Sequence, residues 1–293
     1  MIDTMLEQAL GAGEKARVLS QALPYIRTYK GQTVVIKLGG EALDDPSHAA
    51  LVSSDLALLA LVGMRLVVVH GGGRQVSAAM SEAGLEPTFV NGLRVTDDAA
   101  METVRRVLVG SINSDLVSRL CAAGLQAVGL SGADASLVEA VPLHGPAEQS
   151  LGRVGRVSRV RAAVLHDLLA NGYTPVVASV APGPEGGFLN INADAAAAAL
   201  AAALHAAKLV YVTNVPGLYA DFGDDGSLLS ELDCDQLQAM LPELSAGMRP
   251  KASSSVEALQ HGVGKVHILD GRVEHALLLE IFTDEGIGTQ VLQ

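Results

Sequence analysis

Six short runs of apolar and β-branched residues recur along this chain, with amphipathic stretches between most of them. The runs are TVVIKL, RLVVVH, QAVGL, TPVVASV, LVYVT and KVHILD. Strands that alternate with helices usually pair in parallel, because each helical crossover returns the chain to the same end of the sheet. Runs without polar alternation are typical of strands that are covered on both faces. The pattern predicts an α/β fold with a mainly parallel central sheet.

Net charge, cysteine spacing and the length of apolar runs argue against several classes of partner and site. The formal net charge is −12, a poor match to a phosphate backbone, so we expect no nucleic-acid partner. Cys121 and Cys234 lie far apart without metal-type spacing, which argues against a zinc site and a disulfide framework. The longest apolar run, Ala195 to Leu204, is too short for a bilayer, and the N-terminus lacks a charged-then-apolar leader. We expect a cytoplasmic protein with no membrane anchor.

Glycine-rich turns follow the first two apolar runs. Lys37 stands just before Gly39 and Gly40, and His70 is followed by Gly71 to Gly73. Turns without Cβ atoms let backbone N–H groups approach phosphate or carboxylate oxygens closely. A lysine at the mouth of a buried strand, beside such donors, predicts an anion site.

Three later segments end at the same kind of position. Asn190 to Asp194 precede an alanine-rich helix with Asn192 as its N-cap, Thr213 to Tyr219 form a turn after a strand, and Lys251 follows Pro250 at a helix start. Taken singly, the first and last have plainer interpretations, namely a helix start and an exposed lysine. Together the segments favour one ligand site at the carboxyl ends of the strands, where open α/β sheets bind ligands.

The chain divides into an N-terminal helix and two lobes. A helical pattern covers Asp3 to Tyr29, and the first strand does not need it. Such a helix packs against a partner subunit or folds back on its own domain, and for residues 1–30 we expect the partner subunit. The densest Pro and Gly stretch, Ala181 to Phe188, separates a lobe of residues 31–180 from a lobe of residues 181–293.

Two further segments have clear secondary-structure patterns. A long helix is expected over Asp97 to Ala123, with Thr96 or Asp97 as its cap and Gly124 as its end. The alternation of valine and arginine in Leu151 to Val160 favours a β-hairpin over a helix, with the arginines facing solvent.

The motifs occur in an order that resembles one protein family. KLGG, HGGG, NGLRVT at Asn91 to Thr96, NINAD, TNVPGLY and G-M-x-P-K follow one another over nearly the whole chain. HGGG alone is a weak signal, but NGLRVT followed by NINAD is specific. The chain resembles the amino acid kinase family, and within it the kinases that act on N-acetyl-L-glutamate. The resemblance implies a three-layer αβα sandwich with acetylglutamate binding and dimerisation in residues 31–180 and ATP binding in residues 181–293.

The implied reaction phosphorylates the side-chain carboxylate of N-acetyl-L-glutamate with ATP, which yields N-acetyl-L-glutamyl 5-phosphate for arginine biosynthesis. By the resemblance, the catalytic residues are Lys37, Lys251 and Asp194, and the substrate-binding residues are Gly72, Gly73, Arg94 and Asn190. The implied nucleotide-binding residues are Gly39, Gly40, Thr213, Asn214, Val215, Gly217 and Leu218. No side chain is assigned to a metal.

The cofactor and the acid–base chemistry follow from the residue types. Mg²⁺ is expected with ATP, held mainly by the nucleotide phosphates, because the chain lacks a GK[ST] loop with its hydroxyl ligand. A substrate carboxylate with a pKa of about 4.3 is already ionised at neutral pH, so no base is needed. His70 is therefore assigned a structural hydrogen-bonding role.

The two ends of the chain resemble the arginine-inhibited members of this family. In those, N-terminal helices interlace three dimers into a hexameric ring, and arginine binds beside the helix. The matching positions here are His267, Glu280 and Gly286, and a carboxylate such as that of Glu280 can bind a guanidinium bidentately. The plainer interpretation is a helix start and a C-terminal strand. We expect a homo-oligomer, either a dimer or a hexamer built as a trimer of dimers, with arginine as its inhibitor.

Some residues depart from the family pattern. Ala246 stands where a glycine is common, Arg249 where the residue is usually apolar, and Ala252 to Ser255 form a small, polar stretch where valine and glutamate are usual. The alternatives are a related kinase acting on carrier-linked aminoadipate or another amino acid, and a non-catalytic arginine or nucleotide sensor on the same fold. A dinucleotide-dependent oxidoreductase is disfavoured, because KLGGEALDD lacks the spacing G-x-G-x-x-G.

Overall fold

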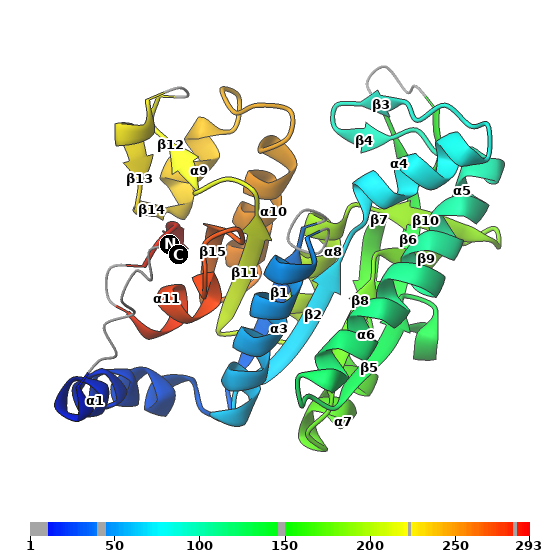
Figure 1. Ribbon diagram of the computed structural model, residues 1–293. Coiled ribbons are helices and arrows are strands. Elements are labelled where there is room, and N and C mark those ends of the chain that lie inside the picture. The colour runs from blue at the N-terminus through cyan, green and yellow to red at the C-terminus, as the bar shows by residue number, and fades with distance from the viewer. Residues whose placement is uncertain (1–10, 40–44, 146–149, 222–223, 284–285) are drawn as a thin grey trace, which may run out of the picture.

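The computed structural model describes residues 11–39, 45–145, 150–221, 224–283 and 286–293. Its centre is an eight-stranded sheet (Figure 1). The strands lie in the order β14 (Glu231–Asp233), β16 (Thr289–Leu292), β15 (Lys265–Asp270), β11 (Lys208–Thr213), β1 (Thr33–Leu38), β2 (Arg65–His70), β8 (Thr174–Ala178) and β5 (Ala127–Ser131). Neighbouring strands are parallel except β15 and β16. The predicted α/β fold with a mainly parallel sheet is confirmed.

Helices cover both faces of this sheet (Figure 1). One layer contains α3 (Pro46–Leu61), α6 (Asn113–Ala122) and α11 (Ala276–Phe282), and the other contains α7 (Ala163–Ala170), α8 (Ala193–Ala203), α9 (Cys234–Met240) and α10 (Arg249–Gln260). Alternate residues of a strand face opposite sides, so Val34 and Ile36 pack on the first layer and Val35 packs on the second. The central strands are mostly apolar because both of their faces are buried, and their charged residues stand at or near strand ends.

Smaller elements stand at the carboxyl ends of the strands. A second sheet has the order β6 (Val138–His144), β7 (Ser150–Val160), β10 (Phe188–Ile191) and β9 (Val180–Pro182). Two hairpins join β3 (Phe89–Val90) to β4 (Leu93–Arg94) and β12 (Leu218–Tyr219) to β13 (Leu228–Leu229). Helices α4 (Gly73–Glu82) and α5 (Asp98–Arg105) form a third apolar cluster.

The hairpin predicted within residues 151–160 is wrong. These residues form a single strand, β7, whose antiparallel partner is β6. Alternation shows which side chains share a face, but it does not show where the chain turns. Here the alternating residues form one long strand, and the turn that joins it to β6 comes before it. Arg156 and Arg159 are exposed, as predicted.

The long helix predicted over residues 97–123 is present, with an unexpected segment in its middle. Asp97 caps its start by accepting a hydrogen bond from the Ala100 N–H at 2.7 Å, and Gly124 follows its last turn. Residues Arg106–Ile112 have π-helical hydrogen bonding between α5 and α6. A π turn admits an extra residue and is common at functional sites. Here it brings Leu108 and Ile112 against the glycine turn after β2.

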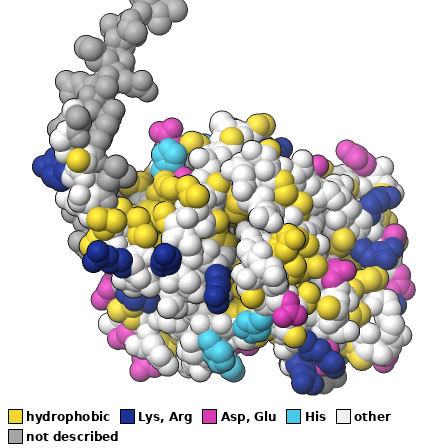
Figure 2. All heavy atoms as spheres, turned by 90° about the horizontal axis from the view of Figure 1, so that it is seen from below, with side chains coloured by type: hydrophobic (Ala, Val, Ile, Leu, Met, Phe, Trp, Pro, Cys, Tyr) yellow, Lys and Arg dark blue, Asp and Glu magenta, His cyan; other side chains and the backbone are white. Residues whose placement is uncertain are grey.

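The N-terminal helix α1 (Ala12–Tyr29) contacts α11 at the edge of the molecule (Figure 1). The predicted residues 3–10 of this helix lie outside the described residues. Leu23 on α1 is 49% exposed, and the face seen from below carries apolar patches between its charged side chains (Figure 2). Within the described ranges, no helix is long and apolar enough to cross a membrane.

Candidate active site

One buried carboxylate pairs with two lysines at the carboxyl edge of the sheet. Asp194 Oδ1 lies 2.9 Å from Lys37 Nζ, and Asp194 Oδ2 lies 3.0 Å from Lys251 Nζ. Lys37 comes from β1, Asp194 from the first turn of α8, and Lys251 from the first turn of α10. All three residues had been predicted as catalytic, and the structure brings them together.

Burial and charge act against each other on these groups. Burial by itself raises the pKa of Asp194, but the ammonium groups of Lys251 and Lys37 outweigh it and hold that pKa well below its usual range. Burial lowers the pKa of Lys251 to about 8, although Asp194 opposes the fall. At neutral pH the cluster therefore carries two positive charges and one negative charge, and its net positive charge attracts an anion.

Two local features start the helices that carry these residues. Asn192 is the N-cap of α8, as predicted, because its Oδ1 accepts hydrogen bonds from the N–H groups of Asp194 and Ala195 at 2.9 and 3.0 Å. Pro250 stands in the first turn of α10, where its missing N–H costs nothing, and Lys251 follows it. The backbone positions of Asp194 and Lys251 are thus fixed by the helix starts that carry them.

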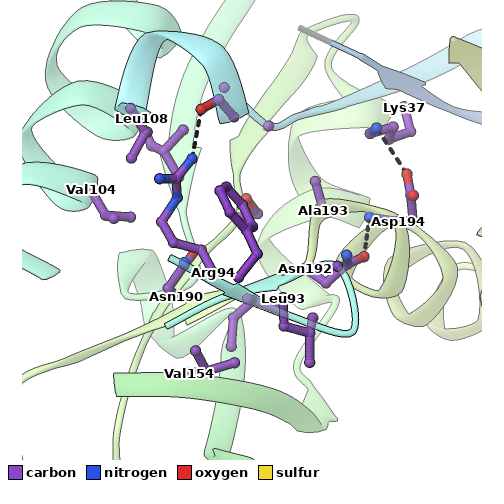
Figure 3. Close-up of a pocket in the computed structure, with 18 residues that line it drawn as sticks. Lys37, Leu93, Arg94, Val104, Leu108, Val154, Asn190, Asn192, Ala193 and Asp194 are labelled. Atoms are coloured by element: carbon purple, nitrogen blue, oxygen red, sulfur yellow. Dashed lines mark hydrogen bonds and ion pairs between the residues drawn. The ribbon is translucent and has the colours of Figure 1, made fainter. Parts of the chain in front are cut away.

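A cavity of about 210 Å³, here called the Arg94 cavity, opens beside Lys37 and Asp194. Figure 3 shows Arg94 across the cavity from them. The Arg94 guanidinium donates to the Gly73 carbonyl at 2.6 Å and to Ser77 Oγ at 2.7 Å, and it stacks over Phe89. Burial lowers its pKa, but from an ordinary value so high that it stays charged. The cavity therefore has a cation at each end.

The other predicted substrate-binding residues line the same cavity. Gly72 has no room for a side chain, because a Cβ atom there would lie 2.2 Å from Ile112 Cδ1, whereas a Cβ on Gly73 would meet nothing within 4 Å. Asn190 Nδ2 donates to Thr96 Oγ1 at 3.2 Å, which holds its amide at the wall. All four residues predicted to bind substrate therefore line the Arg94 cavity.

His70 ends β2 beneath the glycine turn and is fully buried. Its Nε2 lies 3.0 Å from the Asn113 side-chain nitrogen, and its Nδ1 lies 3.0 Å from the Gly71 carbonyl. An amide nitrogen can only donate and a carbonyl can only accept, so Nδ1 carries the proton and the ring is neutral. Burial lowers the pKa of His70 to about 4. The ring therefore has a structural hydrogen-bonding role, as expected from the sequence.

A second cavity of about 530 Å³, here called the Met248 cavity, lies on the other side of the ion pair. Lys251 lines it, together with five predicted nucleotide-binding residues, Thr213, Asn214, Val215, Gly217 and Leu218. Gly39 is not part of its wall, and its N–H donates to the Val212 carbonyl at 2.9 Å. The predicted Gly40 lies outside the described residues. The two cavities meet at the Lys37–Asp194–Lys251 cluster, here called the Asp194 ion pair.

Several residues of the Met248 cavity were not predicted. They come from the end of α9 and the connection to α10, and they are Met240, Glu243, Leu244, Ser245, Gly247 and Met248. Arg249 organises this connection, because its guanidinium donates to the carbonyls of Leu241, Pro242 and Leu244 at 3.2, 3.0 and 3.1 Å. That contact explains why an arginine suits this position, and G-M-x-P-K was its only sequence signal.

A third cavity of about 270 Å³, here called the Glu280 cavity, contains the three residues predicted to bind arginine, His267, Glu280 and Gly286. Tyr25 and Tyr29 from α1 also line it, as does Lys208. Glu280 Oε1 lies 2.5 Å from His267 Nδ1, and Glu280 Oε2 accepts a hydrogen bond from the Ile287 N–H at 2.8 Å. The carboxylate is thus held in place by its own chain. No cluster of three or more metal-binding side chains occurs among the residues that the structure describes.

Comparison with known proteins connects this geometry to a family. The model of the amino acid kinase family matches residues 32–270. The acetylglutamate kinase of Symbiobacterium thermophilum is 50% identical over 99% of this chain and 100% of its own length.

Two solved structures are similar in fold. The N-acetylglutamate synthase of Neisseria gonorrhoeae with coenzyme A and N-acetyl-glutamate has a TM-score of 0.85 at 28% identity over 95% of this chain, which spans 63% of that protein. Its complex with coenzyme A and L-arginine has a TM-score of 0.82 at 27% identity over 94% of this chain and 65% of that protein.

Replacing Asp194 with alanine should lower the free energy of unfolding by about 3–5 kcal/mol at pH 7, because two buried ammonium groups lose their carboxylate. The pKa of Asp194 is lower in the folded state than in the unfolded chain, so its contribution is complete above about pH 4 and declines as the pH falls further. Denaturant unfolding at pH 7 and pH 3 measures both effects. Asp98→Ala, which breaks an exposed pair with Arg153, is the control, with an expected loss of about 1 kcal/mol or less. Equal losses in the two variants would contradict the assignment.

Proposed function

The chain belongs to the amino acid kinase family, and we propose that it transfers the γ-phosphoryl group of ATP to the side-chain carboxylate of N-acetyl-L-glutamate. The product would be N-acetyl-L-glutamyl 5-phosphate, an intermediate of arginine biosynthesis. The observation that carries the proposal is the Asp194 ion pair, which stands where the Arg94 cavity meets the Met248 cavity. The identity of about half to an acetylglutamate kinase over its full length supports the choice of substrate.

The two ends of the Arg94 cavity suit the two carboxylates of acetylglutamate. Arg94 binds the α-carboxylate, and the side-chain carboxylate then points toward Lys37 and Asp194 on the opposite side (Figure 3). Gly72, Gly73 and Asn190 contact the substrate between these ends. In this proposal residues 31–180 form a dimer and supply most of the acetylglutamate site, to which Asn190 is added from the second lobe, and residues 181–293 bind ATP.

The main obstacle to transfer is repulsion between an anionic nucleophile and the γ-phosphoryl group. The substrate carboxylate is already ionised, so the site has no proton to remove. Charge spreads over the phosphoryl oxygens in the transition state, and Lys37 and Lys251 lie where they can neutralise it. Each preorganised donor of this kind contributes a rate factor of about 10² to 10³. Asp194 holds both lysines in place and takes no part in proton transfer.

The residues at this junction suit a magnesium ion that arrives with the nucleotide. Both oxygens of Asp194 are engaged by lysines, so this carboxylate is not available as a ligand. Mg²⁺ would be held by the ATP phosphates and would neutralise part of their charge. We propose the cytoplasm as the location of the reaction, where ATP and amino-acid precursors are available.

Among acetylglutamate, glutamate, aspartate and aminoadipate, only acetylglutamate should give rapid consumption of ATP. Glutamate would bring a free α-ammonium group into a cavity that already has cations at both ends. Aspartate carries the same ammonium group and has one methylene fewer between its two carboxylates. A coupled ADP-release assay with each acceptor measures this. Absence of phosphorylation of acetylglutamate would exclude the proposed reaction, and preference for aminoadipate would favour the related kinase.

Lys37→Ala and Lys251→Ala should each lower kcat by about 10²- to 10³-fold and change KM only a few-fold, because their partners carry the most charge during transfer. In the wild type, kcat/KM for ATP should fall as the pH rises through about 8, since Lys251 then loses its proton. Steady-state kinetics from pH 6 to 10 tests both statements. Lys30→Ala, at an exposed position, is the control and should behave as wild type. A change in KM alone would contradict the assignment.

A second proposal concerns the Glu280 cavity, which we infer binds arginine and inhibits the enzyme. The cavity is lined by the Glu280 carboxylate and by His267, whose Nε2 is buried and has no hydrogen-bond partner in the described part of the chain. Because His267 Nδ1 faces Glu280, the free Nε2 is an acceptor for an N–H donor such as a guanidinium or ammonium group. The synthase of the same fold whose structure contains L-arginine supports this ligand.

Glu280→Gln should raise the arginine concentration for half-inhibition at least about tenfold, because it removes the carboxylate that would face the guanidinium. Glu274→Gln, at an exposed position near the start of α11, is the matched control and should keep wild-type sensitivity.

Light scattering should show a hexamer, a trimer of dimers joined through residues 1–30, with arginine present. Wild-type activity that arginine does not affect would refute the inhibitor, and a dimer under both conditions would refute the ring.

A further inference from the structure

Tyr211 is the largest fully buried side chain of the sheet, and it lies directly under the ion pair. It sits in the middle of β11, with its ring in the apolar cluster that α8 and α10 cover. Its partner in the parallel ladder is Lys37 on β1, so the two side chains point to the same face of the sheet. No sequence motif singled out this residue.

Tyr211 contacts the other two members of the cluster as well. Lys251 Nζ lies 4.9 Å from the centroid of its ring, close enough for a cation–π interaction. The Tyr211 hydroxyl donates to the main-chain carbonyl of Asp194 at 3.2 Å. Burial, and then the charge of Asp194, raise the pKa of Tyr211 well above its ordinary value, so the hydroxyl stays a donor.

The small polar stretch after Lys251 explains how the phenol fits. Ser254 and Ser255 on α10 are buried, and both hydroxyls lie close enough to Tyr211 to oppose the rise in the pKa of its phenol. Ser255 Oγ also donates to the carbonyl of Lys251 at 2.9 Å. The departure from the family pattern at residues 252–255 therefore places small, buried, polar side chains beside the phenol of Tyr211.

From these contacts we infer that Tyr211 is a positioning residue for phosphoryl transfer, whose ring supports the Lys251 ammonium group of α10 and whose hydroxyl ties β11 to the first turn of α8. The inference rests on the proposed function. The charged groups that face Lys251 are Asp194 from α8 and Lys37 from β1. The aromatic face adds to the field of Asp194 and opposes the desolvation of the ammonium group.

Tyr211→Leu and Tyr211→Phe separate the ring from the hydroxyl. In Tyr211→Leu, kcat should fall about 10- to 100-fold with KM for acetylglutamate within about twofold, because Lys251 loses its support. The alkaline limb of kcat/KM should also move about 0.5 to 1 pH unit lower. In Tyr211→Phe, the limb should stay in place and kcat should fall only about three- to tenfold, because the ring remains.

Leu209→Ala is the matched control for loss of packing. Leu209 is fully buried on the same strand and faces the same cluster, but it has no contact with the ion pair among the interactions described here. It should lower thermal stability and leave both kcat and the alkaline limb unchanged when assayed well below its melting temperature. Thermal melts of every variant show which of them fold.

The outcomes distinguish this inference from the proposed function. A wild-type enzyme without acetylglutamate-dependent ATP consumption would refute the function. An active wild type with an unchanged limb and kcat in Tyr211→Leu, or equal losses in Tyr211→Leu and Leu209→Ala, would refute the positioning role alone. If Tyr211→Leu does not fold, Tyr211→Phe decides, and wild-type kcat in that variant would overturn the hydroxyl link and with it the inference.

Discussion

Burial of one carboxylate between two ammonium groups is the interaction on which the rest of the site depends. A buried lysine without a partner would give up its proton or destabilise the fold, and Asp194 makes both charges tolerable at once. The three side chains come from β1, α8 and α10, which meet only when the strand order β11-β1-β2 is complete. Formation of the charged cluster is thus inseparable from formation of the sheet, and its position follows from the carboxyl ends of parallel strands.

The two cavities that flank this cluster differ in chemistry. The Arg94 cavity has charged groups at both ends and suits a small dicarboxylate, whereas the Met248 cavity is lined by Met240, Leu244 and Met248 and suits an apolar ring system. A nucleotide has both characters, with its base at one end and its phosphates at the other. The junction at Lys251 is therefore where an anionic phosphate chain and an anionic acceptor can both be held.

Local rules predicted the elements and many of the site residues, and tertiary contacts determined the rest. Glycine turns, the Asn192 cap and Pro250 mark where strands end and helices begin. The functional residues beside them were therefore expected at one edge of the sheet. That Lys37, Asp194 and Lys251 meet came from the family resemblance, because spacing alone does not specify which helix starts converge. The π segment and the α9–α10 connection carry no periodic signal, since packing against remote residues decides them. The run LVYVT predicts the strand that contains Tyr211, but it does not show that the ring meets Lys251. Alternation in β7 identified a strand and misplaced its turn.

The locked tautomer of His70 has a consequence for the charge of the whole cleft. Asn113 and Gly71 leave the ring neutral, and burial keeps it so down to about pH 4. Lys37, Lys251 and Arg94 against Asp194 leave a surplus of two positive charges in a chain whose formal net charge is −12. That surplus does not vary between mildly acidic and neutral conditions. The cleft thus keeps a constant positive electrostatic potential inside an acidic molecule. Salt screens that potential, so the cleft attracts anions mainly within a Debye length of its opening.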